Sequence, residues 1–151
     1  MLVKVYTSSV INASVSQVWE KVRDFNGLPD WYPSVIDSQI EDGASSDQVG
    51  CIRVFNREDG LYFREKLLAL NDLEHTYTYL LLESNTPMQD YYCTMRLSPI
   101  TDGDRTYIEW LADFQCLPEE ADELQQSLEQ VFQIGFDVLN NFFSQQDSNL
   151  A

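Results

Sequence analysis

The stretch of sequence that decides the fold is LPEEADELQQSLEQVFQIGFDVLNNFF, residues 117–143. Pro118 suits the first turn of a helix, and the acidic residues after it complement the partial positive charge of a helix N-terminus. Apolar residues then recur three or four positions apart, which predicts one amphipathic helix that ends at about residue 143. This stripe consists of Leu117, Ala121, Leu124, Leu128, Val131, Gly135, Val138 and Phe142, and it is widened by Phe132, Leu139 and Phe143.

The length of this helix constrains what it packs against. At 1.5 Å per residue it is roughly 39 Å long. A domain of this size has a radius of gyration of only about 15 Å, so the helix must cross all of it. We expect a single domain at residues 1–143 and a frayed tail at 144–151, because the last residues have no apolar period.

The residues before the helix read mostly as strands separated by short turns. The turns are rich in Gly, Asn, Asp and Pro, and no crossover helix separates successive strands, which predicts an antiparallel meander. The strand-like runs are residues 2–12, 35–41, 50–56, 62–70, 76–83, 91–97 and 106–115.

Two helices are expected after the first strand. Ser14 and Gln17 form a capping-box pattern before an apolar stripe that ends at Asn26-Gly27, which predicts a helix of medium length. The Pro-bounded stretch GLPDWYP (27–33) can hold only a short helical turn or a loop. The sequence thus predicts an α+β fold, with a seven-stranded curved antiparallel sheet wrapped round a long C-terminal helix. Because a long helix cannot touch a strongly bent sheet everywhere, we expect an internal cavity.

Aromatic residues are the main candidates for the cavity lining. The chain has 8 Tyr, 8 Phe and 3 Trp, which fits a lined pocket, although a large aromatic core accounts for them as well. Strand alternation and the helix stripe assign Tyr77, Tyr79, Tyr91, Met95, Trp110, Phe132 and Leu139 to inward faces, with Trp31 and Tyr32 at the cavity mouth or capping the core. The absence of a side chain at Gly135 has two possible explanations, a close packing contact and space for a ligand.

One hairpin brings two opposite charges together. With Gly60 in the left-handed region of a three-residue loop, Arg53 faces Glu65 and Phe55 faces Phe63. The rival two-residue turn sets Arg53 against Lys66, a like-charge pair that costs stability. We choose the first register, which embeds the Arg53–Glu65 pair among apolar neighbours. It is either a structural ion pair or a polar anchor inside the cavity.

Composition excludes several classes of function. Nine Lys and Arg against 25 Asp and Glu give a net charge of -16, which repels phosphate backbones and anionic lipids, so we expect no nucleic-acid partner and no membrane insertion. The single histidine, His75, lies at a strand junction and is expected to be exposed. One histidine and scattered cysteines provide no metal site, and no glycine-rich phosphate motif indicates a nucleotide cofactor. Three cysteines without C-x-x-C spacing, and no signal peptide, predict reduced thiols in a cytoplasmic protein.

The ordered segments VSQVWEKVRDFNGLPDWYP, VGCIRVF, FREKLLALND, TYTYLLLES, YYCTMRLSP and YIEWLADF resemble the START-like (SRPBCC) superfamily, in its polyketide cyclase/dehydrase and lipid-transport branch. The resemblance runs from about residue 3 to 143. It implies a helix-grip fold with a deep hydrophobic cavity for lipids, polyketides or aromatic molecules. The hairpin is also similar to that of plant lachrymatory-factor synthases, and this implies that Arg53 positions a ligand oxygen and that Glu65 transfers a proton.

Three functions follow as hypotheses. The first is binding of a small apolar ligand that bears one polar group, without a cofactor. The second is a cyclase, dehydrase or isomerase activity, in which Glu65 acts as general acid/base with Arg53. The third is a protein-interaction domain that uses its acidic surface.

Overall fold

The computed structural model describes the backbone of residues 1–150 and the side chains of residues 1–145. Within this range the structure has seven strands and three α-helices, joined by short turns, as the pattern predicts. In chain order they are β1 (Leu2–Ile11), α1 (Val15–Val22), α2 (Leu28–Trp31), β2 (Val35–Ile40), β3 (Ile52–Arg57), β4 (Tyr62–Asn71), β5 (Thr76–Ser84), β6 (Gln89–Ile100), β7 (Arg105–Gln115) and α3 (Ala121–Leu150).

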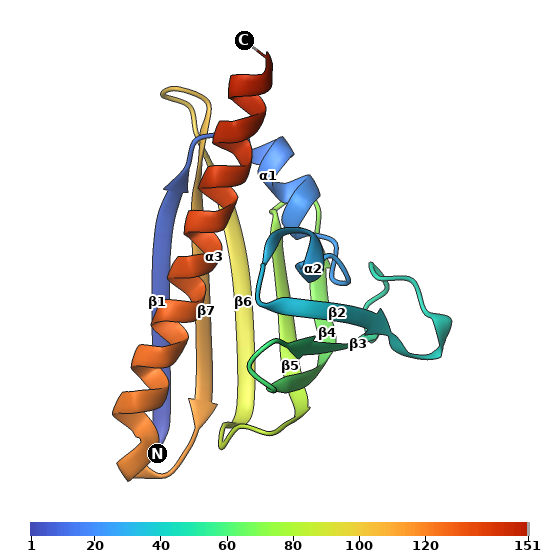
Figure 1. Ribbon diagram of the computed structural model, residues 1–151, viewed down its shortest axis with the longest axis vertical. Helices are drawn as coiled ribbons and strands as arrows, with labels where there is room; N and C mark the ends of the chain where they lie inside the picture. The colour runs from blue at the N-terminus through green and yellow to red at the C-terminus, as the bar shows by residue number, and fades with distance from the viewer. Residues whose placement is uncertain (151) are drawn as a thin grey trace.

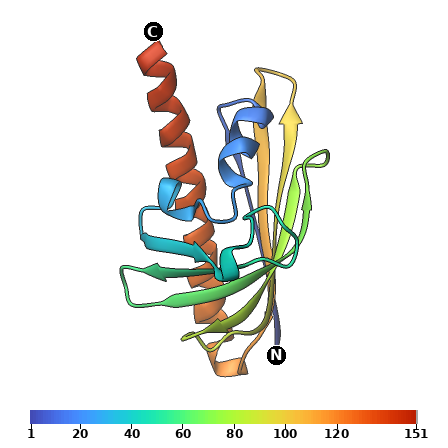
Figure 2. The same cartoon turned by 90° about the vertical axis from the view of Figure 1, so that its right-hand side faces the viewer.

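The strands form one antiparallel sheet in the order β1-β7-β6-β5-β4-β3-β2. From β2 to β7, strands that are consecutive in the chain pair with each other, and β1 pairs with β7 at one edge of the sheet (Figure 1). The sheet bends strongly, so that β2, β3 and β4 run across the direction of β1, β6 and β7, while the helices lie on one face (Figure 2). The seven-stranded curved sheet with its terminal helix confirms the predicted fold class.

The first helix starts as the sequence predicts. The Ser14 hydroxyl accepts a hydrogen bond from the Gln17 amide at 3.3 Å, and the Gln17 side chain accepts one from the Ser14 amide at 3.3 Å. This capping box satisfies two N–H groups that lack partners within the helix. The Pro-bounded stretch forms only the single turn of α2.

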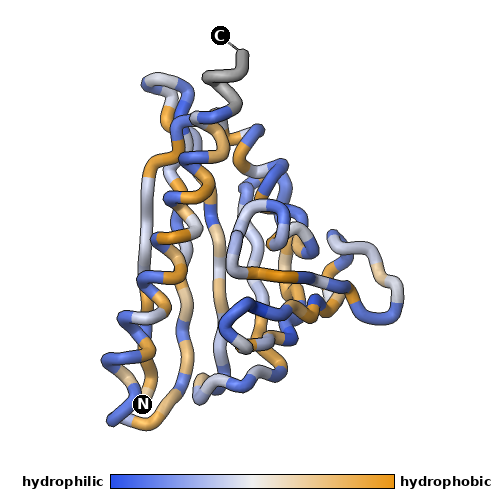
Figure 3. The backbone as a smooth tube through the Cα atoms, viewed as in Figure 1, coloured by the Kyte–Doolittle hydropathy of each residue, from blue (hydrophilic) through white to orange (hydrophobic). Residues whose placement is uncertain are grey.

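The terminal helix differs from its prediction in rotation and length. Apolar residues recur along α3 (Figure 3), but the most deeply buried side chains are Phe132, Phe136, Leu139 and Phe143. Phe136 was absent from the predicted stripe. Leu117, assigned to that stripe, precedes α3 and is 56% exposed. Pro118 belongs to a 3₁₀ turn rather than to the first α-helical turn.

The helix continues to Leu150, whereas the pattern predicts an end near residue 143. The predicted fraying of residues 144–151 falls largely outside the described side chains and stays a prediction. No helix of the described residues is both long and apolar enough to cross a membrane.

Gly135 is a packing residue. A Cβ atom placed on it would lie 2.8 Å from Cζ3 of Trp110 and 3.4 Å from ring atoms of both Trp31 and Tyr32. Real Cβ contacts are essentially never as short as 2.8 Å. The missing side chain therefore lets α3 approach these rings, which supports the close-packing reading over the reading as ligand space.

Candidate ligand-binding cavity

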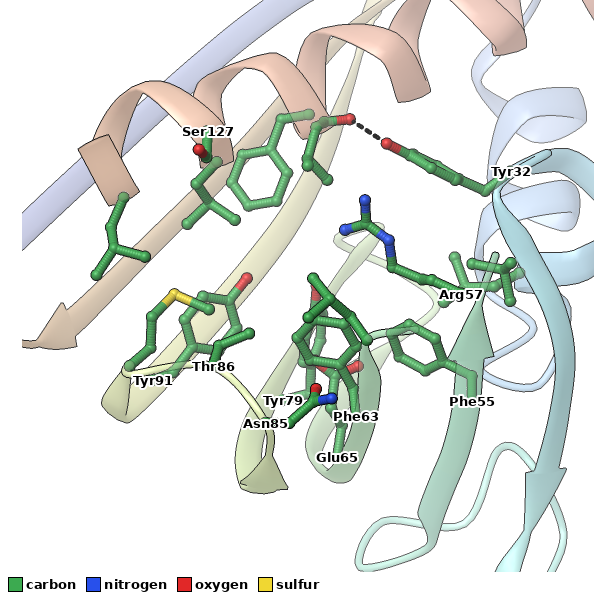
Figure 4. A pocket seen from close by; sticks show the side chains of 18 of the residues that line it. Tyr32, Phe55, Arg57, Phe63, Glu65, Tyr79, Asn85, Thr86, Tyr91 and Ser127 are labelled. Atoms are coloured by element: carbon green, nitrogen blue, oxygen red, sulfur yellow. Dashed lines mark hydrogen bonds between the residues drawn. The ribbon is translucent and has the colours of Figure 1, made fainter. Parts of the chain in front are cut away.

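A cavity of about 320 Å³ lies between the N-terminal half of α3 and the bent part of the sheet (Figure 4). Its walls come from α2 and the residue that follows it, the start of β2, the β3–β4 hairpin, β5, the loop before β6, β6, β7 and α3. The lining is mostly apolar. It consists of Leu28, Tyr32, Val35, Arg53, Phe55, Arg57, Leu61, Phe63, Glu65, Tyr79, Asn85, Thr86, Pro87, Met88, Tyr91, Trp110, Leu124, Ser127, Leu128, Val131 and Phe132.

Nine of the residues expected at the site line this cavity. They are Arg53, Glu65, Tyr32, Phe55, Phe63, Tyr79, Tyr91, Trp110 and Phe132. The hairpin register is confirmed, because Arg53 pairs with Glu65 and Phe55 with Phe63, and Gly60 has a φ of 86°. The stacked rings of Phe55 and Phe63, 5.0 Å apart, form one wall.

The other five expected residues lie in the core outside the cavity lining: Trp31, Tyr77, Met95, Gly135 and Leu139. The Trp31 ring lies against Trp110 at 6.0 Å and fills the space beside Gly135. Tyr77 packs against Trp19 and Phe25, and its hydroxyl contacts the Met95 sulfur at 3.5 Å. Strand parity assigned these residues to the inward face, but it cannot say which part of that face the helices cover.

Several lining residues were not predicted. Leu124, Leu128 and Val131 belong to the predicted helix stripe, but the stripe alone does not show which of its residues line the cavity and which pack in the core. Residues 85–88 read only as a turn. Arg57 carries the clearest overlooked signal, because it follows Phe55 by two positions and so lies on the same strand face as Arg53.

The floor of the cavity carries a buried ion pair. Arg53 donates a hydrogen bond from Nε to Oε1 of Glu65 at 2.9 Å, and its Nη2 lies 2.8 Å from the same oxygen in an ion pair. A second hydrogen bond runs from Nη1 to the Phe25 carbonyl at 3.0 Å. The guanidinium carbon lies 4.0 Å from the centre of the Phe25 ring and 4.8 Å from that of Tyr79. The side chains of the pair are only 3% and 5% exposed, so the pair is almost fully buried.

Burial and pairing act in opposite directions on this pair. Burial raises the pKa of the Glu65 carboxyl, and the Arg53 guanidinium limits the rise. Burial alone would lower the pKa of Arg53, but the Glu65 carboxylate more than offsets this and holds that pKa above its usual value. Arg53 therefore stays protonated, and Glu65 is the member of the pair that can exchange a proton.

A cluster of polar atoms lies beside the pair. Trp110 Nε1 donates to the Tyr79 hydroxyl at 3.2 Å and contacts the Cys93 sulfur at 3.1 Å. Burial raises the pKa of the Tyr79 and Tyr91 hydroxyls well above the usual tyrosine value. These hydroxyls remain protonated at neutral pH and can orient a ligand as neutral hydrogen-bonding groups.

The cavity reaches the surface on one side. Asn85, Pro87 and Ser127 line it and are exposed. Beside this opening the Tyr32 hydroxyl donates to the Val131 carbonyl at 2.9 Å, which ties α2 to α3 (Figure 4). The Arg57 guanidinium projects below this bond toward the cavity (Figure 4).

His75 does not take part in the cavity. It is half-buried rather than exposed, because its ring lies edge-on to Trp19 with the ring centres 5.5 Å apart. Among the side chains that the structure describes, no group of three His, Cys, Asp or Glu residues could hold a metal ion.

The chain is similar in structure to several solved proteins. The protein XoxI from Bacillus cereus is 26% identical with a TM-score of 0.86, over 96% of this chain and 98% of that one. An uncharacterized protein from Bacillus thuringiensis is 27% identical with a TM-score of 0.83, over 93% and 98%. A protein from Thermobifida fusca, solved by NMR, is 26% identical with a TM-score of 0.84, over 94% and 93%.

The family comparison covers the same length of chain. The model of the family described as polyketide cyclase / dehydrase and lipid transport matches residues 3–141. This span includes all seven strands, the walls of the cavity and most of α3. The chain therefore belongs to the polyketide cyclase/dehydrase and lipid-transport family, as its resemblance to the START-like superfamily indicated.

Proposed function

We propose that the protein binds a small apolar molecule bearing one polar group in the cavity beneath α3. The observation that carries this proposal is the cavity itself, about 320 Å³ in volume and walled mainly by aromatic and aliphatic side chains. Small-molecule sites typically combine such an apolar wall with a few well-placed polar groups. Here Arg53, Glu65 and the buried tyrosine hydroxyls are such groups.

The volume limits the size of the ligand. Ligand pockets in proteins typically have volumes of about 300–1,000 Å³, and this cavity, at about 320 Å³, is at the small end of that range. We therefore expect a medium-length alkyl chain or a compact aromatic molecule rather than a sterol or a two-chain lipid.

The test is calorimetric titration with neutral amphiphiles of this size, octan-1-ol and 2-naphthol. We expect one molecule to bind per chain. We also expect the melting temperature to rise, since ligand at 100 times Kd stabilises the folded state by about 2.7 kcal/mol.

Two variants show whether the probe is inside the cavity. Leu128→Trp adds a large ring to the lining, whereas Ile134→Trp adds the same ring at a position on α3 that is 48% exposed. Binding should be lost in the first variant and kept in the second, with both folded by circular dichroism. Equal binding by both folded variants, or no binding by the unmodified protein, would contradict the proposal.

A second candidate function is proton transfer by Glu65. The carboxyl lines the cavity, its pKa is raised by burial, and both contacts from Arg53, the hydrogen bond from Nε and the ion pair through Nη2, are made with Oε1. Glu65 can therefore take a proton from one atom of a bound ligand and return it to another, an isomerisation that needs no further reactant. Arg53 would hold the ligand oxygen on which negative charge develops.

This second function is tested with ligands identified by native mass spectrometry of the purified protein. In Glu65→Gln, turnover of such a ligand should disappear while its binding persists. Turnover that continues unchanged in a folded Glu65→Gln protein removes Glu65 from the mechanism.

A further inference from the structure

Arg57 has an unused hydrogen-bond donor in the wall of the cavity. Among the buried side-chain nitrogen and oxygen atoms that the structure describes, Arg57 Nε and Ser34 Oγ have no hydrogen-bond partner. Of these two residues only Arg57 lines the cavity, and its guanidinium points into the space below Tyr32 (Figure 4). Buried donors are nearly always paired in native proteins, so an unpaired one at a cavity wall is available to accept a partner atom from a bound ligand.

The charge of Arg57 is also less fully neutralised than that of Arg53. Arg53 forms one hydrogen bond and an ion-pair contact with a carboxylate that is as deeply buried as itself, and it donates once to the Phe25 carbonyl. Arg57 pairs through Nη2 with Asp59 at 2.9 Å, but the Asp59 side chain is 44% exposed and therefore screened by water. Among the residues that line the cavity, Arg53 and Arg57 are the cations and Glu65 is the acid. The lining thus keeps a net positive charge in a protein whose net charge is -16.

We propose that Arg57 binds the carboxylate of an amphiphilic monocarboxylic acid, with the apolar part of the ligand extending toward Tyr79, Tyr91 and Trp110. This inference rests on the proposed function, since it needs the cavity to hold a ligand. A carboxylate matches it well, because a guanidinium binds planar carboxylates through its N–H groups and remains charged at all physiological pH values. The head group then lies near the exposed rim, and the tail is buried among rings.

The test compares three probes of equal chain length by calorimetry at fixed ionic strength. These are octanoate, octan-1-ol and octylammonium. We expect octanoate to bind about tenfold more tightly than octan-1-ol, the effect of one charge-assisted hydrogen bond. Octylammonium should bind most weakly.

Three variants test whether Arg57 causes the preference for octanoate. Arg57→Met should remove the advantage of octanoate, so that octanoate and octan-1-ol bind this variant with affinities within about twofold of each other. Asp59→Asn, which frees Arg57 from its ion pair, should strengthen octanoate binding by about threefold. Arg64→Met is the matched control, because Arg64 also pairs with a partly exposed acid, Glu41, but does not line the cavity. It should change neither affinity.

The outcomes separate the two proposals. If octan-1-ol binds and octanoate binds no more tightly, or if Arg57→Met keeps the preference for octanoate, Arg57 is not the anchor and the proposed function stands. If neither probe binds the unmodified protein, both proposals fail together.

Discussion

Arg53 and Glu65 depend on each other for their place in the interior. Removing a charge from water is unfavourable, and the attraction between the two groups offsets that loss only because they are close and hydrogen-bonded. Here the guanidinium makes a hydrogen bond and an ion-pair contact with one carboxylate oxygen, donates to the Phe25 carbonyl and lies over the Phe25 ring. Removing one partner therefore leaves a buried charge without compensation.

We predict that Arg53→Met destabilises the protein by about 3–5 kcal/mol at pH 7. The loss should shrink in acid. Arg53 limits the rise of the Glu65 pKa in the folded unmodified protein, so the pKa of the buried carboxyl is higher still in the variant. The stability difference between the two proteins is therefore complete above the Glu65 pKa of the folded variant, and it is relieved as the pH falls from that value toward the Glu65 pKa of the folded unmodified protein. Urea denaturation of the variant and the unmodified protein at each pH measures the difference.

The control is Arg53→Met combined with Glu65→Leu. With no charge left in the interior, most of the stability should return. A double variant as unstable as the single one would show that packing around Arg53, rather than charge, dominates its effect.

The thiols offer a second prediction at the scale of single residues. Burial raises the pKa of Cys93 to about 12 and also raises the pKa of Cys51. Both thiols are buried, whereas Cys116 is half-buried. Since the thiolate is the reactive form, Cys116 should react first with a disulfide reagent at pH 8, and the other two only on unfolding.

Replacing Cys116 with Ser should remove the fast reaction. Mass spectrometry of the labelled protein assigns the sites. Labelling of Cys93 as rapidly as Cys116 in the native protein would mean that the core around Cys93 opens to solvent.

The position of a single residue could be predicted only where a local rule fixes its neighbours. The turn geometry at Gly60 determined the register of the β3–β4 hairpin, and this register places Arg53 opposite Glu65. The Phe25 carbonyl that completes the ion pair comes from a distant segment, and no local rule places it. Arg57 shares strand parity with Arg53, so its inward direction was predictable, while its unpaired Nε depends on the whole three-dimensional surroundings.

At the scale of elements, Gly135 controls how closely α3 approaches the rings beneath it. The Trp110 ring has little freedom to move, because it stacks on Phe132 at 4.3 Å and donates a hydrogen bond to Tyr79. An atom added at Gly135 must therefore push α3 away from the sheet.

We predict that Gly135→Ala lowers stability by about 1 kcal/mol, although alanine favours helices. The helix propensity gain is about 1 kcal/mol, and overpacking a core costs roughly 1–3 kcal/mol. Thermal and urea unfolding test this, with Gln130→Ala at an exposed position of the same helix as the control. A stabilised Gly135→Ala protein would mean that the rings move aside easily.

The helix shows what periodicity can and cannot predict. A repeat of three to four residues identified α3 and its approximate start, since every helix has this period. It did not identify Phe136 as a fully buried residue. The stripe of apolar positions is broad, and the rotation of the helix within it is set by the partners on the sheet, Trp110 above all.

At the scale of the whole molecule, the charge of -16 acts on stability. Mutual repulsion between like charges destabilises a compact chain, and salt weakens it, with the screening length falling from about 30 Å at 0.01 M to about 10 Å at 0.1 M. We predict that the melting temperature rises by a few degrees between these salt concentrations. Sodium and potassium chloride should act alike, and a fall in melting temperature would mean that the ion pairs contribute more than the repulsion.

The hypothesis that the acidic surface binds another protein, which would be a basic one, stays a prediction.

The order of the strands could be predicted from the sequence, because strands that are joined by short turns usually pair with each other. The presence of a cavity could also be predicted, since a straight helix cannot follow a bent sheet. The size and boundaries of the cavity could not be predicted, because residues 85–88 and α2 close its sides, and the sequence pattern of these two segments does not say where they lie in space.

The pairing of β1 with β7 also sets an order of events during translation. β1 is the first strand of this chain to leave a ribosome, yet Tyr6 pairs with Leu111, about 100 residues later. At about 5–20 residues per second, β1 stays without its partner for roughly 5–20 s. The strands from β2 to β7 can meanwhile join hairpin by hairpin, so the nascent sheet is completed at the edge that was synthesised first.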